Sequence, residues 1–144
     1  MNASRMLLAT AWIAYVTGWL LPVAEGGSKF LQGVPGYEAL MIALTPLWDR
    51  SLWEKPGLAA LFVLSGATNL VMIGSWVAVR SQWRRGLRAV AWAGLASLAV
   101  NSHWFFNQDR DLHLKIGYYL WWWSFLPLTI GTFRLRRQLA AASE

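Results

Sequence analysis

Two histidines and two aspartates gather in one short stretch of the chain, HWFFNQDRDLH, as His103, Asp109, Asp111 and His113. Imidazole and carboxylate groups are suitable ligands for a divalent metal ion. In an extended segment Asp109, Asp111 and His113 would point to the same side, because side chains alternate along a strand. The same run is also typical of a solvated polar loop in which His103 forms a hydrogen bond at a helix end, and that interpretation is favoured. The four residues are kept as the candidate metal site.

No other pattern in the sequence indicates a reaction. The chain has no cysteine, so thiol chemistry, disulfides and cysteine metal sites are excluded. No serine lies in a nucleophile elbow, and no glycine-rich phosphate loop is present. The long apolar segments hold no acidic residue of the kind that a proton relay needs. We therefore expect a non-enzymatic protein, without catalytic residues and without a cofactor.

The composition indicates a membrane protein. Of the 144 residues, 56% are hydrophobic, 14% are charged and 11 are tryptophan, a balance that is unusual for a water-soluble domain of this size. A net charge of +6 is compatible with nucleic acid, but no recognition motif accompanies it, so no nucleic-acid partner is expected. Anionic lipid headgroups are the expected partner of the arginines that flank the apolar stretches, namely Arg84, Arg85, Arg88, Arg134, Arg136 and Arg137.

Four apolar segments are long enough to cross a bilayer, since a spanning helix needs about 20 mostly apolar residues. They are residues 6–24, 57–79, 87–106 and 116–133, and charged residues are absent from their interiors. We expect an all-α fold, in which residues 1–144 form one integral membrane domain built as a bundle of four transmembrane helices.

The charged residues predict the orientation of this bundle. Eight of the 13 Lys and Arg residues fall before the first segment, between the second and third, or after the fourth, whereas six of the seven acidic residues fall in the other connections. Because basic residues are retained on the cytoplasmic side, both termini are expected in the cytoplasm, with the protein in a bacterial inner membrane. LLPVAEGGS shows no small-x-small cleavage site, so the first segment is interpreted as an uncleaved helix.

The outer connection, residues 25–56, is predicted to contain one short helix. Tyr37, Leu40, Met41 and Leu44 follow helical spacing, and Pro46 should end the helix after about nine residues, which is too short to span a membrane. The helix is expected to lie on the outer interface or to cap the mouth of the bundle.

Three consecutive tryptophans, Trp121 to Trp123, stand near the outer end of the last segment. An aromatic belt at the headgroup level explains most tryptophans of the chain, Trp19 and Trp104 included. Successive residues of a helix are about 100° apart, so the three rings cannot all share one lipid-facing stripe. We expect Trp121 to face protein, and Trp122 to face lipid together with Tyr118 and Phe125.

Small and polar residues form the predicted seams between helices. Asn69 is the most informative, because an unsatisfied amide in the middle of a membrane is costly. An interhelical hydrogen bond is the expected role of Asn69, and a pore-lining or ligand-contacting role is the alternative. The predicted packing or pore residues are Gly66, Asn69, Gly74, Ser97, Asn101, Trp121 and Ser124.

The closing GYYLWWWSF, the outer loop before it and the TPLW segment resemble a loose group of small bacterial proteins with four membrane-spanning helices. This resemblance covers most of the chain and implies a fold only. Tryptophan-rich sensory proteins are similar in size and tryptophan content but have five spans.

Three functions follow from these features as hypotheses. The first is a non-enzymatic membrane module that acts by helix packing and homo-oligomerisation, as a pore or as the membrane subunit of a two-part system with a cytoplasmic partner protein. The second is a binder of a lipid or other apolar ligand at the outer aromatic layer, and accessory or immunity-type membrane subunits would have the same composition. The third is an enzyme that uses the His and Asp residues of HWFFNQDRDLH.

Overall fold

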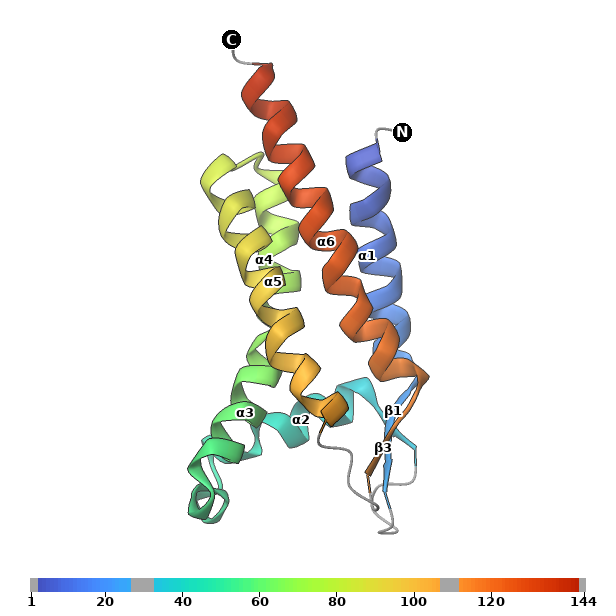
Figure 1. Cartoon of the computed structure of the whole chain (residues 1–144), viewed down its shortest axis with the longest axis vertical. Helices are drawn as coiled ribbons and strands as arrows, with labels where there is room; N and C mark the ends of the chain where they lie inside the picture. Colours follow the sequence, from blue (N-terminus) through green and yellow to red (C-terminus); the bar gives the residue numbers. More distant parts are fainter. Residues whose placement is uncertain (1–2, 27–32, 107–111, 143–144) are drawn as a thin grey trace.

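The structure, a computed structural model, describes residues 3–26, 33–106 and 112–142. It is mostly helical, which confirms the predicted all-α class (Figure 1). The helices are α1 (Ala3–Leu20), α2 (Gly36–Leu44), α3 (Pro56–Ala67), α4 (Asn69–Arg80), α5 (Arg84–Phe106) and α6 (Ile116–Ala141). Two short 3-10 helices, Thr45–Leu47 and Arg50–Glu54, connect α2 to α3.

Helix α6 is the centre of the bundle, because it packs against α1 on one side and against α5 on the other (Figure 1). The contact with α1 is close, since a Cβ atom added to Gly18 would lie 2.8 Å from the carbonyl oxygen of Gly117. Small residues at such positions let two helix backbones approach each other. Helix α4 packs against α5 and completes the bundle.

The second apolar segment is one helical run with a local break. Thr68 joins the end of α3 to the start of α4, and its hydroxyl donates a hydrogen bond of 2.6 Å to the carbonyl oxygen of Ser65. Such bonds to the preceding turn often bend helices. In the described part of the chain, Pro56–Arg80 is the one helical run that is long and apolar enough to cross a membrane, with 25 residues and an 18-residue stretch whose mean hydropathy is 1.8.

Two helix boundaries differ from the predicted segments. Helix α1 ends at Leu20 instead of residue 24, because Pro22 has no N–H for the helix and disfavours helical backbone at Leu21. Helix α6 continues beyond residue 133 to Ala141, through a sequence of arginine, leucine and alanine residues that are strong helix formers.

A small antiparallel sheet, which the sequence did not predict, lies at the end of the bundle opposite the two termini (Figure 1). Its central strand β1 (Pro22–Gly26) pairs with β2 (Val34–Pro35) and with β3 (Leu112–Leu114). Lys115 follows β3 and forms an ion pair with Glu25 of β1. The hydrogen bond from Lys115 and its charge lower the pKa of Glu25 from the usual value of 4.5.

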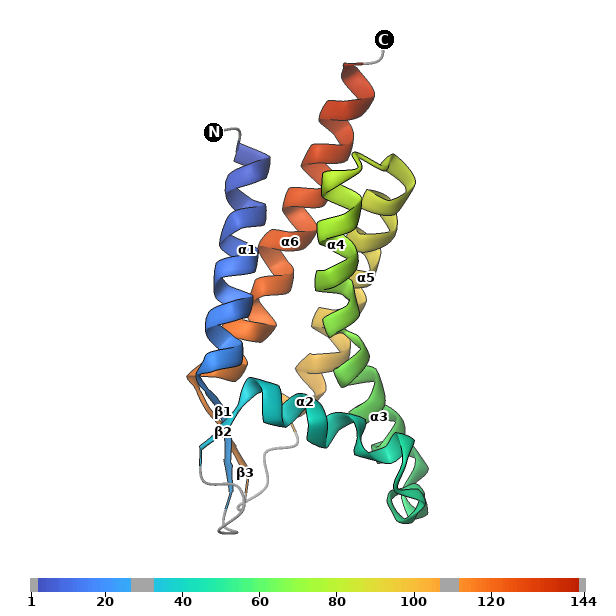
Figure 2. The same ribbon diagram turned by 180° about the vertical axis from the view of Figure 1, so that it is seen from behind.

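Helix α2 confirms the predicted short helix, since it spans Gly36–Leu44 and ends before Pro46. Gly36 lies against the end of α1, where an added Cβ would be 2.7 Å from the Cα atom of Trp19. From there α2 crosses the end of the bundle toward α3 (Figure 2). This arrangement agrees with a helix that caps the end of the bundle, and the predicted placement on an outer membrane interface stays a prediction.

Candidate functional site

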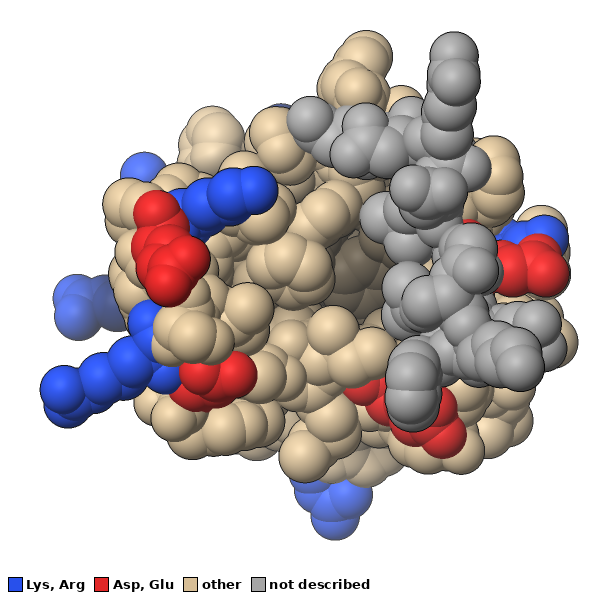
Figure 3. Space-filling view, turned by 90° about the horizontal axis from the view of Figure 1, so that it is seen from below, with Lys and Arg blue, Asp and Glu red and all other residues tan. Residues whose placement is uncertain are grey.

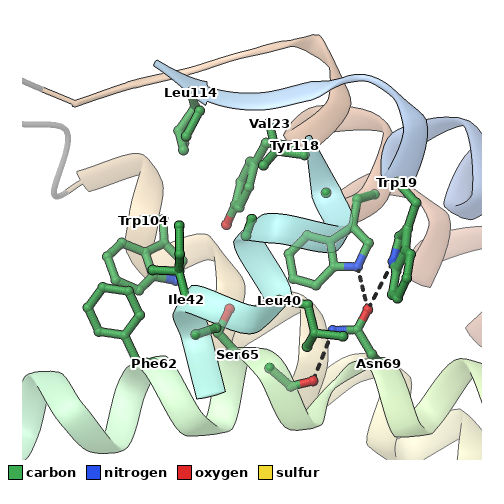
Figure 4. Close-up of a pocket in the computed structure, with 16 residues that line it drawn as sticks. Trp19, Val23, Leu40, Ile42, Phe62, Ser65, Asn69, Trp104, Leu114 and Tyr118 are labelled. Carbon is green, nitrogen blue, oxygen red and sulfur yellow. Dashed lines mark hydrogen bonds between the residues drawn. The ribbon is translucent and has the colours of Figure 1, made fainter. Parts of the chain in front are cut away.

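A cavity of about 430 Å³ lies beneath α2, between this helix and the ends of α1, α3, α5 and α6 (Figure 4). Its volume is within the range of about 300–1,000 Å³ that is usual for small-molecule pockets. Viewed along the bundle from the end that carries the sheet, the molecule shows charged side chains near its edge and a hollow among uncharged residues (Figure 3).

The walls of the cavity are mostly apolar. Aromatic rings come from four helices, as Trp19 of α1, Phe62 of α3, Trp104 of α5 and Trp121 of α6. The rings of Phe62 and Trp104 are in contact, with centroids 5.0 Å apart. No charged side chain of the described residues lines the cavity. The site is therefore suited to an uncharged molecule with a large apolar surface.

Asn69 provides a polar group at one end of this cavity. Its Oδ1 atom accepts three hydrogen bonds, from Tyr15 Oη at 3.0 Å, Trp19 Nε1 at 3.3 Å and Trp121 Nε1 at 3.1 Å. Its Nδ2 atom donates to the carbonyl oxygen of Gly66 at 2.9 Å. Figure 4 shows the two indole rings converging on the amide. Asn69 therefore ties α1 and α6 to α4 and fixes two of the rings that line the cavity.

A second buried amide, Asn101 of α5, lies behind the cavity wall. Its Oδ1 atom accepts a hydrogen bond of 2.5 Å from Ser65 Oγ, and its Nδ2 atom donates to Thr68 Oγ1 at 3.3 Å and to the carbonyl oxygen of Ser97 at 2.8 Å. The backbone carbonyl oxygen of Asn101 accepts a hydrogen bond from the hydroxyl of Tyr118. Asn101 therefore links α3, α5 and α6.

The break between α3 and α4 positions both clusters. Ser65 and Asn69 are four residues apart and lie on the same side of the helical run, so both reach the cavity. Thr68, between them, points to Asn101 instead. A single turn of helix thus supplies one side chain to the Asn69 cluster and two to the Asn101 cluster.

The other predicted packing residues have different environments. Gly66 faces α2, where an added Cβ would lie 2.9 Å from a methyl carbon of Leu44. Ser97 and Ser124 are buried and donate to carbonyl oxygens of their own helices. An added Cβ at Gly74 would meet no atom within 4 Å among the described residues, so Gly74 is not a close contact within this chain.

The predicted orientation of the tryptophans is right for Trp121 and wrong for Trp122. Trp121 is buried, whereas Trp122 is half-buried and donates its indole N–H toward Leu98 O at 3.1 Å and Ser102 Oγ at 3.2 Å on α5. Tyr118 and Phe125, predicted on the same lipid-facing side, are both buried. The physical reason is that α6 has neighbours on two sides, α1 and α5, so two adjacent rings both face protein. Trp123 is the exposed ring of the three.

The predicted metal ligands are only partly placed. His103 is half-buried near the end of α5, with its ring 6.0 Å from that of Trp104, and His113 is exposed in β3. Asp109 and Asp111 lie outside the described residues. No group of three His, Cys, Asp or Glu residues that could hold a metal ion occurs within residues 3–26, 33–106 and 112–142. The metal site stays a prediction.

The predicted lipid-binding arginines gather at the end of the molecule that carries both termini. Arg84, Arg85 and Arg88 lie in the first turns of α5, and Arg134, Arg136 and Arg137 lie near the end of α6. The guanidinium of Arg84 donates to the carbonyl oxygen of Leu139, which joins these two helix ends.

Three aromatic residues that bond to Asn69 or Asn101 were not predicted as site residues from sequence. The sequence predicts Trp19 in the aromatic belt and Tyr118 toward lipid, and it indicates no role for Tyr15. A signal for them does exist, because Tyr15 and Trp19 are one helical turn apart, as are Tyr118 and Trp121. Two such pairs beside a helix that carries a buried amide indicate a ring cluster around that amide.

Comparisons of the chain with family models, with curated proteins and with solved structures find no match. The resemblance to small bacterial four-span proteins therefore stays a prediction.

Proposed function

We propose that this chain is a multi-pass protein of a bacterial inner membrane, with four spanning helices formed by α1, the run α3–α4, α5 and α6. Large apolar side chains on the outward faces of these helices support the proposal. Examples are Ile13 with 68% exposure and Leu70 with 67%. Apolar patches of this extent are rare on water-soluble monomers and normal where lipid covers the surface.

Hydropathy alone underestimates α1 and α6. Both helices are rich in tryptophan and tyrosine, whose amphipathic rings favour membrane interfaces although hydropathy scales treat them as weakly polar. At 1.5 Å per residue, the 26 residues of α6 extend over about 39 Å, more than the hydrocarbon thickness of about 30 Å.

The proposed orientation places the arginine-rich end, with both termini, in the cytoplasm. The two termini lie at the same end of the bundle, as an even number of spans requires (Figure 1). The cavity, α2 and the sheet then lie at the outer surface. Cysteines introduced at Thr45 and Ala142 test this orientation, because an impermeant thiol reagent should label only the Thr45 position in intact cells. Labelling of Ala142→Cys in intact cells would show that the arginine-rich end does not face the cytoplasm and would contradict the proposed orientation.

We further propose that the protein binds a lipid-like or other apolar ligand in the cavity beneath α2, without chemical transformation of that ligand. The observation that carries this proposal is an uncharged cavity of about 430 Å³ whose rings are fixed by a buried amide. Ligand pockets typically combine such apolar walls with a few polar groups that fix orientation. The pore hypothesis has less support, because Met72, Phe125 and Leu128 fill the bundle on the inner side of Asn69.

A matched pair of substitutions on α2 tests ligand binding. Ala39 lines the cavity, whereas Met41 on the same helix is exposed. Purified protein in a mild nonionic detergent is photolabelled with a dodecyl hydrocarbon that carries a diazirine, and labelled residues are located by mass spectrometry. We expect labels at cavity residues in the unmodified protein and in Met41→Trp, and their loss in Ala39→Trp. Equal labelling of the cavity residues in both variants would show that the probe does not enter the cavity.

A further inference from the structure

We infer that the ligand of the cavity is an alcohol, an apolar molecule whose one neutral hydroxyl group donates its proton to the oxygen of Ser65 or of Tyr118. The inference rests on the proposed ligand binding and adds the chemical class of the ligand. It follows from a count of the hydrogen-bond donors and acceptors that the lining has already used.

The hydroxyl of Tyr118 has already donated its proton. A hydroxyl group has one proton to donate, and Tyr118 donates it to the backbone carbonyl oxygen of Asn101, a group that can only accept. The phenolic oxygen of Tyr118, which lines the cavity, is therefore left as an acceptor.

The hydroxyl of Ser65 has also donated its proton. This follows from the orientation of the Asn101 amide, which is determined by its neighbours. The Nδ2 atom of Asn101 donates to the carbonyl oxygen of Ser97, so the atom that faces Ser65 is Oδ1. An amide oxygen accepts only, and Ser65 must therefore donate its proton to it. The Ser65 oxygen, like that of Tyr118, presents the cavity with a hydrogen-bond acceptor.

The indole donors of Trp19 and Trp121 are occupied as well. Each indole has one N–H, and both are donated to Asn69 Oδ1, whose identity is fixed because Nδ2 donates to the carbonyl oxygen of Gly66. Two side-chain N–H groups of the described lining residues donate no described hydrogen bond. They are the second amide N–H of Asn69 and the indole N–H of Trp104.

A ligand that matches this inventory must donate a proton to the oxygen of Ser65 or to that of Tyr118, and it can accept from an N–H group. A hydroxyl group does both, whereas an ether or a ketone only accepts. A carboxylate or an ammonium group would bring an unpaired charge into a lining without charged residues among those described, which is strongly unfavourable. The chemical class that fits is a long-chain, isoprenoid or sterol-like alcohol.

A series of competitors with one alkyl body tests the inference. Photolabelling of the cavity by the diazirine-bearing dodecyl hydrocarbon is measured against rising concentrations of 1-dodecanol, dodecyl methyl ether, 2-dodecanone and dodecanoate. One hydrogen bond to the ligand corresponds to roughly a five- to tenfold difference in affinity, so 1-dodecanol should displace the probe at about a fifth to a tenth of the concentration needed by the ether or the ketone. Dodecanoate should be the weakest competitor.

Substitutions in the protein identify the residues responsible. The advantage of 1-dodecanol over its methyl ether should fall to about twofold or less in at least one of Ser65→Ala and Tyr118→Phe, namely in the variant that lacks the oxygen to which the ligand donates. An unchanged advantage in both variants would overturn the assignment of these two residues. Ser124→Ala is the matched control, because this serine is buried beside Trp121 but does not line the cavity. Its preference for the alcohol should equal that of the unmodified protein.

The outcomes separate the two proposals. Equal competition by all neutral compounds, or stronger competition by the ketone or by dodecanoate, would overturn the assignment of an alcohol while ligand binding stands. Absence of labelling in the cavity, without any competition, would overturn the proposed binding function itself. The competitor series on the unmodified protein decides the question even where a variant does not fold.

Discussion

Asn69 and Asn101 are both buried amides within helices, yet the chain surrounds them with different partners. Ring donors from α1 and α6 surround Asn69, each far away in sequence. Hydroxyl and backbone groups of α3 and α5 surround Asn101, with one tyrosine from α6. The first amide therefore holds bulky side chains in place, and the second holds small ones.

Because of this difference, we expect the two clusters to have different roles at the cavity. The three donors on Asn69 Oδ1 exceed the two lone pairs of a carbonyl oxygen, so the bonds compete with one another and the rings depend on a single acceptor. The bonds on Asn101 are spread over two amide atoms and a backbone carbonyl. We expect the shape of the cavity to depend on Asn69 and its polarity to depend on Asn101.

Trp121→Ala should have the largest effect, because Trp121 is both a donor of the Asn69 cluster and a wall of the cavity. Truncating a buried tryptophan costs about 3 to 5 kcal/mol in protein cores, and less where lipid fills the space. Trp123→Ala is the control, since that ring is exposed at 41%. Thermal unfolding of both variants in one detergent measures the difference, and equal effects would mean that Trp121 is not packed as the structure places it.

Asn69→Leu should follow in size. Leucine keeps the volume but removes the acceptor of three donors, and interhelical hydrogen bonds in membranes are worth about 0.6 kcal/mol each, so a loss of about 2 kcal/mol is expected. The variant should also lose photolabelling of the cavity by the dodecyl probe, because Trp19 and Trp121 are no longer held. Normal labelling in a destabilised protein would show that Asn69 does not shape the cavity.

Asn101→Leu should destabilise the protein by about half as much, roughly 1 kcal/mol, because the bonds to Ser65 and Thr68 are lost while the backbone carbonyl still accepts from Tyr118. The cavity should remain, and its preference for an alcohol should weaken, since the Ser65 proton becomes free to turn toward the cavity. The competitor series measures this change. A variant that loses the cavity entirely would remove the distinction between the two clusters.

The sequence predicted the helices well and the contacts between them only in part. Periodic apolar residues and Pro46 were sufficient to locate α2, and Asn69 was identified as an interhelical residue because a buried amide needs partners. The partners themselves depend on how α1 and α6 are rotated about their axes, and a hydrophobic stripe does not fix this rotation when a helix has two neighbours. For that reason the prediction that Trp122 faces lipid is wrong.

The sheet shows a second limit of prediction from sequence. β1 and β3 lie more than eighty residues apart in the chain, and with five and three residues they are too short for an alternation of apolar and polar residues to indicate a strand. Their pairing depends on the end of α1 lying beside the start of α6, an arrangement that exists only after the bundle has formed. The Glu25–Lys115 ion pair and the position of Leu114 in the cavity wall follow from this tertiary arrangement.

Trp122→Phe should have a smaller effect than either amide substitution. Phenylalanine keeps a ring against Phe105 but loses the indole N–H that points to Leu98 and Ser102, a change worth about 0.6 kcal/mol. Because Trp122 belongs to neither amide cluster, the cavity should label as in the unmodified protein. A loss of labelling would mean that the packing of α5 against α6 shapes the cavity as much as Asn69 does.

The smallest expected effect is a change of stability with pH. It comes from an ion pair that belongs to neither amide cluster. The pKa of Glu25, in strand β1, is lowered first by its hydrogen bond with Lys115 and then by the charges of Lys115 and His113. A carboxyl group whose pKa is lower in the folded state stabilises the protein above its unfolded pKa, and this contribution is lost as the pH falls through the folded pKa. The melting temperature should therefore decrease slightly on acidification from about pH 6 to below the usual pKa of 4.5, and less so in Glu25→Gln. Because the ion pair is exposed, the shift should also shrink at high salt. An acid-induced decrease of the same size in Glu25→Gln would assign the pH dependence to other carboxylates and leave the ion pair without a role in holding β1 to β3.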